Sequence, residues 1–181
     1  MMPAGASAID RVLLSLSRAA CKNARHAIYD HYSMTLTVDK EDAMEAVTVK
    51  CRCGSVQLRL DSAPVAQFYC HCDDCRAATG GAFIPIALFP TEALSVVGGS
   101  ILTWTYKTLP RTRCSTCGTF LFGEPPGLGL RGLSGFLLPS ELFAPAFHIQ
   151  CRYAVLPVKD VLPHFKSLPA SFGGVDEVVG W

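Results

Sequence analysis

The sequence predicts an all-β domain over residues 46–181, preceded by an N-terminal extension over residues 1–45. From Val47 onward, short runs rich in β-branched and aromatic residues recur, and glycine, proline or cysteine clusters separate most of them. This part contains no segment with the length and the 3.6-residue apolar period of a long helix. Half of the residues are hydrophobic and 17% are charged, which provides enough apolar surface for a packed core.

Seven runs of the domain are predicted to be strands. They are residues 47–51, 56–60, 65–69, 83–89, 102–106, 119–122 and 147–153. Residues 56–60 and 102–106 alternate apolar and polar side chains, which is typical of strands with one buried face. Residues 123–135, GEPPGLGLRGLSG, have the glycine and proline density of a loop, so we expect a loop there.

The N-terminal extension has a different pattern. Drawn as a helix, residues 11–27 place basic side chains on one side and apolar ones on the other. The basic side includes Arg11, Arg18, Lys22 and Arg25, and Asp10 is the only acidic residue before position 30. A basic amphipathic helix of this kind is typical of a mitochondrial presequence. The alternatives are a surface helix and a poorly ordered extension without a function. The polar residues 39–42 separate this segment from the domain.

Charge and hydropathy exclude two classes of partner. The chain has 16 basic and 15 acidic residues and a formal net charge of +1, which gives no general attraction to nucleic acid or to an anionic membrane. The longest nearly apolar run, residues 82–89, contains a proline and is far shorter than the roughly 20 residues of a membrane span. We therefore expect neither nucleic acid nor a membrane as a partner.

Nine cysteines are many for a chain of this length. They are Cys21, Cys51, Cys53, Cys70, Cys72, Cys75, Cys114, Cys117 and Cys151. A secreted disulfide scaffold is one interpretation, but the number is odd and the apolar run VLLSL is shorter than the h-region of a signal peptide. The spacings C-x-C, C-x-C-x-x-C and C-x-x-C suit ligands that converge on one ion. Reduced, metal-bound thiols favour the cytosol, with mitochondria as the alternative because of the N-terminal helix.

Two of the cysteine pairs predict a closed structural zinc site. A glycine follows the second cysteine of each pair, where it lets the backbone turn and brings its amide towards a thiolate. The four ligands are Cys51, Cys53, Cys114 and Cys117. They lie far apart in the sequence, so a zinc ion would clamp the two halves of the domain together. Some of the negative charge of this site would be offset by the nearby Lys50, Arg52, Arg111 and Arg113.

The remaining cluster, YCHCDDCR, predicts an open metal site. Cys70, Cys72 and Cys75 offer three thiolates, and a vacant fourth position distinguishes catalytic from structural zinc. An iron–sulfur cluster is a less favoured alternative at these spacings. A second closed site would form instead if a fourth ligand came from Cys151, His148 or Cys21.

The polar neighbours of this cluster are candidates for supporting roles. Arg76 could stabilise the anionic cluster or bind a carboxylate of the substrate. His71 alternates with two ligands along the backbone, so its ring is expected to point away from the metal. Asp73 and Asp74 are either turn-forming residues or a base close to the metal.

Taken in order, these motifs resemble those of the glutathione-dependent formaldehyde-activating enzyme family, which includes centromere-protein-V-like proteins. They are C-x-C-G, C-H-C-x-x-C-R, R-x-R-C-x-x-C-G and a late F-x-P-x-F-H-I element, within about residues 47–170. The resemblance implies a Mss4-like fold of several coiled antiparallel sheets, clamped by a structural zinc. It implies two zinc ions per chain, a structural one on Cys51, Cys53, Cys114 and Cys117 and a catalytic one on Cys70, Cys72 and Cys75.

The resemblance also implies a reaction, the formation or cleavage of the carbon–sulfur bond of S-hydroxymethylglutathione, with glutathione as co-substrate. The main hypothesis is therefore a zinc-dependent carbon–sulfur lyase that acts on a thiol adduct. A non-catalytic zinc module for protein binding is the alternative. Methionine-sulfoxide reduction, which occurs on a similar fold, needs an unligated reactive cysteine, and here only Cys21 and Cys151 remain. If residues 123–135 border the open site, a substrate other than glutathione becomes an alternative.

Overall fold

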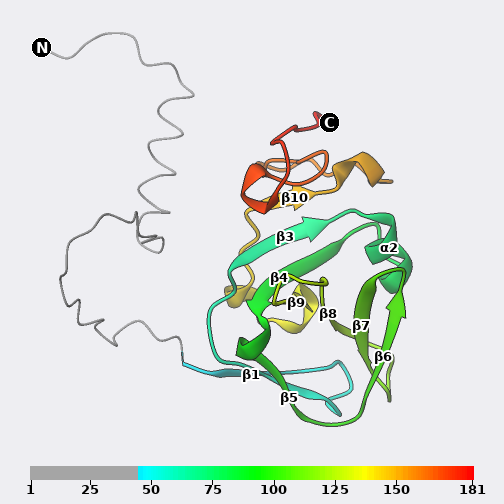
Figure 1. Ribbon diagram of the computed structural model, residues 1–181, viewed down its shortest axis with the longest axis vertical. Helices are drawn as coiled ribbons and strands as arrows, with labels where there is room; N and C mark the ends of the chain where they lie inside the picture. The colour runs from blue at the N-terminus through cyan, green and yellow to red at the C-terminus, as the bar shows by residue number, and fades with distance from the viewer. Residues whose placement is uncertain (1–44) are drawn as a thin grey trace, which may run out of the picture. The chain divides into compact units, whose positions relative to one another are not determined.

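The computed structural model describes residues 45–181, which form two β-sheets (Figure 1). The smaller sheet has the order β1-β2-β5 and contains β1 (Val47–Lys50), β2 (Gln57–Leu60) and β5 (Leu94–Gly98). The larger sheet has the order β10-β3-β4-β9-β8-β7-β6. Its strands are β3 (Ala66–Cys70), β4 (Ile84–Pro90), β6 (Ile101–Tyr106), β7 (Leu109–Cys114), β8 (Phe120–Gly123), β9 (Leu130–Ser134) and β10 (Phe147–Ile149).

The prediction of an all-β fold with several sheets is confirmed. Neighbouring strands are antiparallel, except that β10 pairs with β3 in parallel. The α-helical content of the described part is a single short helix, α2 (Asp73–Thr79), which follows β3 (Figure 1). No helix within residues 45–181 is long and apolar enough to cross a membrane.

Two apolar clusters make up the core. The first packs the inward side chains of β2, such as Leu58 and Leu60, against Leu94, Leu121 and Leu133. The alternation of exposed and buried residues along β2 is the period of two that its sequence predicted. The second cluster contains Cys70 together with apolar residues of β3, β4 and β10. One thiol of the predicted open site therefore belongs to this second part of the core.

The prediction of a loop over residues 123–135 is wrong for its second half. Leu130–Ser134 form β9, which lies between β4 and β8 in the larger sheet. The glycines of this run serve different purposes. Gly127 and Gly129 have φ values of +74° and +62°, which side chains rarely adopt, so they form the turn. Gly132 is in the strand, where an added Cβ would lie 3.3 Å from Ile86 Cγ2.

Two further strands and one strand end also differ from the prediction. β5 and β7 were not expected, because neither has a clear alternation of apolar and polar residues. β10 ends at Ile149, earlier than predicted, because Gln150 has a φ of +57° and Cys151–Tyr153 form a 3-10 turn. The predicted amphipathic helix of the N-terminal extension lies outside the described residues.

Candidate metal centres and the pocket beside them

The four-cysteine group is formed by two turns, one after β1 in the smaller sheet and one at the end of β7 in the larger sheet. Cys51 follows β1, and Cys114 is the last residue of β7. The Sγ atom of Cys51 lies 3.3 Å from that of Cys53 and 3.6 Å from that of Cys114, and Cys53 and Cys114 are 3.8 Å apart. Together with Cys117, all four sulfurs are within 4.8 Å of one another. Sulfurs bound tetrahedrally to zinc at about 2.3 Å lie about 3.8 Å apart, so this group fits a zinc ion.

The two turns that carry these cysteines have the same backbone geometry. Gly54 and Gly118 have φ values of +77° and +72°. Their amides donate to the carbonyl oxygens of Cys51 and Cys114, at 2.9 and 3.0 Å. The predicted turn is present, but the glycine amides donate to carbonyl oxygens instead of sulfur. The amide that donates to sulfur is that of Val56, 3.2 Å from Cys51 Sγ.

Hydroxyl groups complete the surroundings of the exposed sulfurs. Ser55 Oγ is 2.7 Å from Cys53 Sγ, and Thr119 Oγ1 is 3.1 Å from Cys117 Sγ. The hydrogen bond from Thr119 is the main reason that the pKa of Cys117 falls to about 6. Hydroxyl donors favour the thiolate, which is the form that binds zinc.

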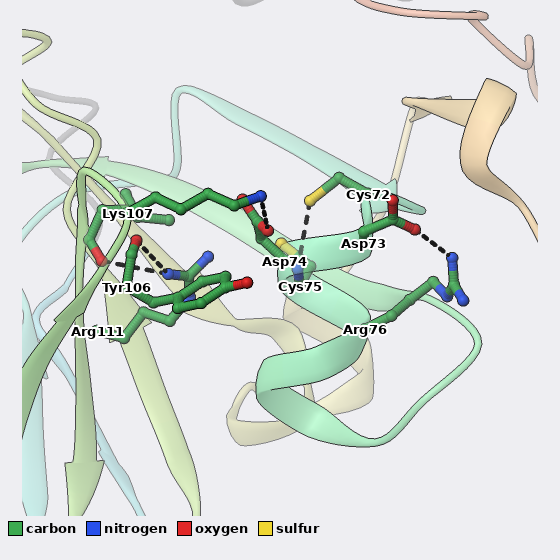
Figure 2. Close-up of polar contacts among 9 residues, drawn as sticks. Cys72, Asp73, Asp74, Cys75, Arg76, Tyr106, Lys107 and Arg111 are labelled. Atoms are coloured by element: carbon green, nitrogen blue, oxygen red, sulfur yellow. Dashed lines mark hydrogen bonds and ion pairs between the residues drawn. The ribbon is translucent and has the colours of Figure 1, made fainter.

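The three-cysteine group is built by the junction of β3 and α2. Cys70 ends β3, Cys72 is the N-cap of α2, and Cys75 lies in the first turn of that helix. The amide of Cys75 donates to Cys72 Sγ at 3.3 Å, so the N-cap interaction also sets the position of the second thiol (Figure 2). The three sulfurs lie within 4.8 Å of one another.

Negative charge in this group gathers on one sulfur. Hydrogen bonds from the Cys70 and Cys75 thiols lower the pKa of Cys72 to about 2. The same interaction with Cys72 raises the pKa of Cys70 well above its usual value. Three thiolates at this separation repel one another, so a cation is needed for all three to ionise. The donor set and its spacing therefore fit a zinc ion held by three thiolates.

A fourth protein ligand does not join this group from residues 45–181. His148, one of the three predicted alternatives, belongs to a separate group with Asp160 and His164. Cys151 is buried apart from the cluster, and Cys21 lies outside the described residues. The other two members of the His148 group were not foreseen from the sequence. The FHI element at residues 147–149 marked His148 as a candidate. No feature of the nearby sequence connects it with the PHF at residues 163–165, which contains His164.

An apolar pocket of about 140 Å³ adjoins the three-cysteine group. Cys70 and Cys75 form part of its wall. The rest is mainly apolar, with Phe68, Leu88 and Phe120 among the lining residues. Gly123 and Pro125 also border it, so the start of the glycine- and proline-rich run lies beside the open site. A cavity of about 150 Å³ accommodates a benzene molecule, so this pocket has room for a small apolar group.

Arg111 is a site residue that the sequence placed elsewhere. It was expected to offset charge at the four-cysteine group, but it lines the same pocket as Cys70 and Cys75. Its side chain is buried, and Nη1 donates to the carbonyl oxygens of Tyr106 and Leu109 at 3.4 and 3.2 Å (Figure 2). Its charge acts on the Cys75 thiol. A buried cation thus stands beside the three-cysteine group.

The charged side chains of helix α2 form ion pairs. Arg76 Nη1 is 2.7 Å from Asp73 Oδ1 and 2.8 Å from the carbonyl oxygen of Tyr153. Lys107 Nζ is 2.7 Å from Asp74 Oδ1. Figure 2 shows Asp73 turned towards Arg76, whereas Asp74 points to the opposite side, towards Lys107 and the ends of β6 and β7.

The His71 ring is directed away from the thiols, as its alternation with the ligands predicted. It is fully buried, and its Nε2 lies 2.9 Å from His148 Nδ1 in β10. The histidine therefore joins the cysteine loop to the neighbouring parallel strand. It is not among the ligand atoms of the three-cysteine group.

Comparisons with known proteins identify the family of the chain. The family model described as "Glutathione-dependent formaldehyde-activating enzyme" matches residues 46–152, more than half of the chain. A solved structure of a Rhodobacter sphaeroides protein is 22% identical, with a TM-score of 0.44, and the match covers 52% of this chain and 89% of that one. A search of curated proteins found no match. On the strength of the family match, which spans both cysteine groups, the chain belongs to the glutathione-dependent formaldehyde-activating enzyme family.

Proposed function

We propose that the protein is a zinc-dependent carbon–sulfur lyase that acts on a thiol adduct, with S-hydroxymethylglutathione as the first candidate. Membership of the family supports an activity of this kind. The observation that carries the proposal is the three-cysteine group, which stops one ligand short and exposes two of its cysteines to a pocket. A site that were only structural would have its fourth position filled by the protein.

In this proposal, Cys70, Cys72 and Cys75 hold the catalytic zinc, and Cys51, Cys53, Cys114 and Cys117 hold the structural one. Zinc bound by three thiolates supplies a Lewis acid with an open position, which favours the thiolate form of a substrate sulfur. The junction of β3 and α2 keeps the three thiols in place through the N-cap hydrogen bond. The apolar wall of the pocket excludes water from the carbon that the reaction transfers.

The cleavage of a hydroxymethyl adduct requires one proton transfer. The carbon–sulfur bond breaks, its electron pair passes to sulfur, and the hydroxyl proton leaves as the carbonyl forms. We assign this proton to Asp74. Its carboxylate is 30% exposed, against 64% for Asp73, and it shares with Arg111 a cavity next to the pocket. Arg111 lines both spaces, and the Asp74 carboxylate is paired with Lys107 Nζ at 2.7 Å.

The Asp74 assignment has a matched control on the same helix turn. Asp74→Asn is expected to lower kcat by about a hundredfold, the usual contribution of a general base, with zinc content unchanged. Asp73→Asn removes a carboxylate that faces Arg76 instead, and it should leave kcat within a few-fold of the wild type. Equal losses of kcat in the two variants would contradict the assignment.

The apolar pocket raises a second candidate for the carrier thiol. Glutathione has two carboxylates, and the Arg76 side chain proposed to bind one of them already contacts Asp73 and the Tyr153 carbonyl. A thiol with a small apolar group would instead match the pocket in size and polarity. We place the protein in the cytosol, where such thiols stay reduced, with mitochondria as the alternative if residues 1–45 act as a targeting segment.

Exchange spectroscopy by NMR tests the reaction and the carrier together. Zinc-loaded protein is added to formaldehyde with glutathione, and in parallel to formaldehyde with benzyl mercaptan. Faster exchange between free and thiol-bound formaldehyde supports the proposal, and the faster of the two mixtures identifies the carrier. Cys72→Ser should abolish the effect, whereas Cys151→Ser, outside both cysteine groups, should retain it. No acceleration with either thiol, with both zinc sites filled, would favour a non-catalytic binding module.

A further inference from the structure

A third group of possible ligands lies on the other side of the cysteine loop. His148 is in β10, and Asp160 and His164 are in the C-terminal segment that follows it. A parallel bridge pairs His148 with His164, and their rings stack with centroids 4.3 Å apart. Each of the three residues offers a ligand atom within 4.8 Å of the others. Two imidazoles and one carboxylate thus converge from two segments of the chain.

The distances in this group are close to those around a bound ion. His148 Nε2 lies 2.9 Å from Asp160 Oδ2, and His164 Nε2 lies 3.4 Å from Asp160 Oδ1. Nitrogen and oxygen ligands bound tetrahedrally to zinc at about 2.0–2.1 Å lie about 3.3–3.4 Å apart. Small adjustments of the carboxylate would therefore place all three atoms around one ion.

The ring of His164 has a buried nitrogen that no hydrogen bond from the described part of the chain satisfies. Its side chain is 10% exposed, and its buried Nε2 has no hydrogen-bond partner within residues 45–181. The nearest carboxylate oxygen, Asp160 Oδ1, already accepts the amide of Leu162 at 2.9 Å. A buried polar atom without a partner is unfavourable, and a metal ion would supply the missing contact.

His148 is oriented as a metal ligand would be. Metal-bound histidines usually donate their second ring N–H to a neighbouring acceptor, which fixes the ring. His148 Nε2 shares a hydrogen bond of 2.9 Å with Asp160 Oδ2, and Nδ1 lies 2.9 Å from His71 Nε2. If a metal ion replaced the Nε2 proton, Nδ1–H would donate to His71 and the Nε2 lone pair would face the ion. His71 would then hold the His148 ring in position through this hydrogen bond, and it would take no part in the three-cysteine site.

We propose that His148, Asp160 and His164 bind a divalent transition-metal ion, separate from the two cysteine sites. Two imidazoles and a carboxylate suit zinc and the neighbouring late first-row ions, which prefer nitrogen and oxygen ligands. The ion would fasten the segment around Asp160 to β10, and through β10 to β3, where the cysteine loop begins. This inference is independent of the proposed lyase activity.

Cobalt titration of the full chain tests the site. The cysteine sites are kept filled with zinc, a weak chelator removes more weakly held ions, and Co²⁺ is then added. The wild type is expected to bind Co²⁺ with visible d–d bands and without the sulfur-to-metal charge-transfer bands of a thiolate site. His164→Gln and Asp160→Asn should each bind one equivalent fewer, and the exposed control Asp61→Asn should bind as the wild type does.

Two results of the titration would overturn the proposal. One is an unchanged number of Co²⁺ equivalents in both folded variants, and the other is charge-transfer absorption with every equivalent that binds. Circular dichroism shows whether the variants fold, and Asp160→Asn retains the oxygen that accepts the Leu162 amide. If either variant unfolds, NMR spectroscopy of the wild type tests the site instead. Co²⁺ is then expected to broaden or shift the imidazole resonances of His148 and His164. Unchanged resonances of these two rings would also overturn the proposal.

Discussion

At the scale of single residues, cysteine side chains with different surroundings perform different tasks. Cys72 caps helix α2, and hydrogen bonds from the Cys70 and Cys75 thiols lower its pKa. Cys117 is kept towards its thiolate form by a hydroxyl. Cys151 is buried, and burial raises the pKa of its thiol. The surroundings, and not the residue type, determine which of these thiols are suited to bind a metal.

Cys72→Ser should separate the two tasks of this residue. Serine is a good N-cap, so helix α2 is expected to remain, while the thiolate is lost. The protein should stay folded by circular dichroism, contain one zinc fewer by elemental analysis, and lose its activity. Unfolding of the whole domain by this substitution would show that the three-cysteine site is structural.

Cys151 should be inert towards alkylation. Burial raises the pKa of this thiol to about 12, so it is protonated at pH 8. Iodoacetamide reacts with thiolates, and mass spectrometry is therefore expected to find Cys151 unmodified in the folded protein at pH 8 and modified after unfolding in guanidinium. Rapid labelling in the folded protein would restore this residue as a candidate redox cysteine, as methionine-sulfoxide reduction would require.

At the scale of elements, tight turns position the cysteine pairs. The turn between β5 and β6 lies against the first pair. Gly99 in this turn has a φ of +87°, and an added Cβ would overlap the Ser55 carbonyl oxygen and Val56 Cα. These backbone atoms cannot easily move, because the Val56 amide donates to Cys51 Sγ. The close approach of two turns therefore requires glycine.

Gly99→Ala is expected to destabilise the domain, and Gly98→Ala is the control. The unfavourable φ alone costs about 1–2 kcal/mol, and the overlap with the backbone of Ser55 adds to it. At Gly98 an added Cβ would meet Gln57 Cβ at 3.8 Å, an ordinary contact. Urea unfolding should give a clearly lower midpoint for the first variant and a midpoint near the wild type for the second. Equal midpoints would contradict the close approach of the turns.

At the scale of the whole molecule, the four-cysteine group joins the two sheets. Its first pair follows β1 in the smaller sheet, and its second pair begins at the last residue of β7 in the larger one. Apolar side chains from both sheets, such as Leu58 and Leu133, pack beside it in one cluster. A zinc ion here would therefore hold together elements that are distant in the sequence.

Loss of this zinc should unfold the domain. Structural zinc contributes about 10–16 kcal/mol in small peptides, compared with about 5–15 kcal/mol for the stability of a whole domain. Cys53→Ser is expected to give an aggregated or unfolded protein, and a strong chelator should lower the Tm of the wild type in calorimetry. A Tm that is unchanged when elemental analysis finds no zinc would contradict a structural role for the site.

The all-β class, most of the strands, the two cysteine pairs and the three-cysteine cluster could be predicted from the sequence, because each of these features is local. Alternation along β2 depends on nearest neighbours, and a C-x-x-C spacing brings two thiols together without help from distant residues. The relation between β3 and β10 is not local. Only the tertiary structure placed β9 inside the larger sheet, Arg111 beside Cys75, and His164 next to His148. The physical reason is that these neighbours are set by strand pairing and by the packing of side chains from remote segments, which no short stretch of sequence contains.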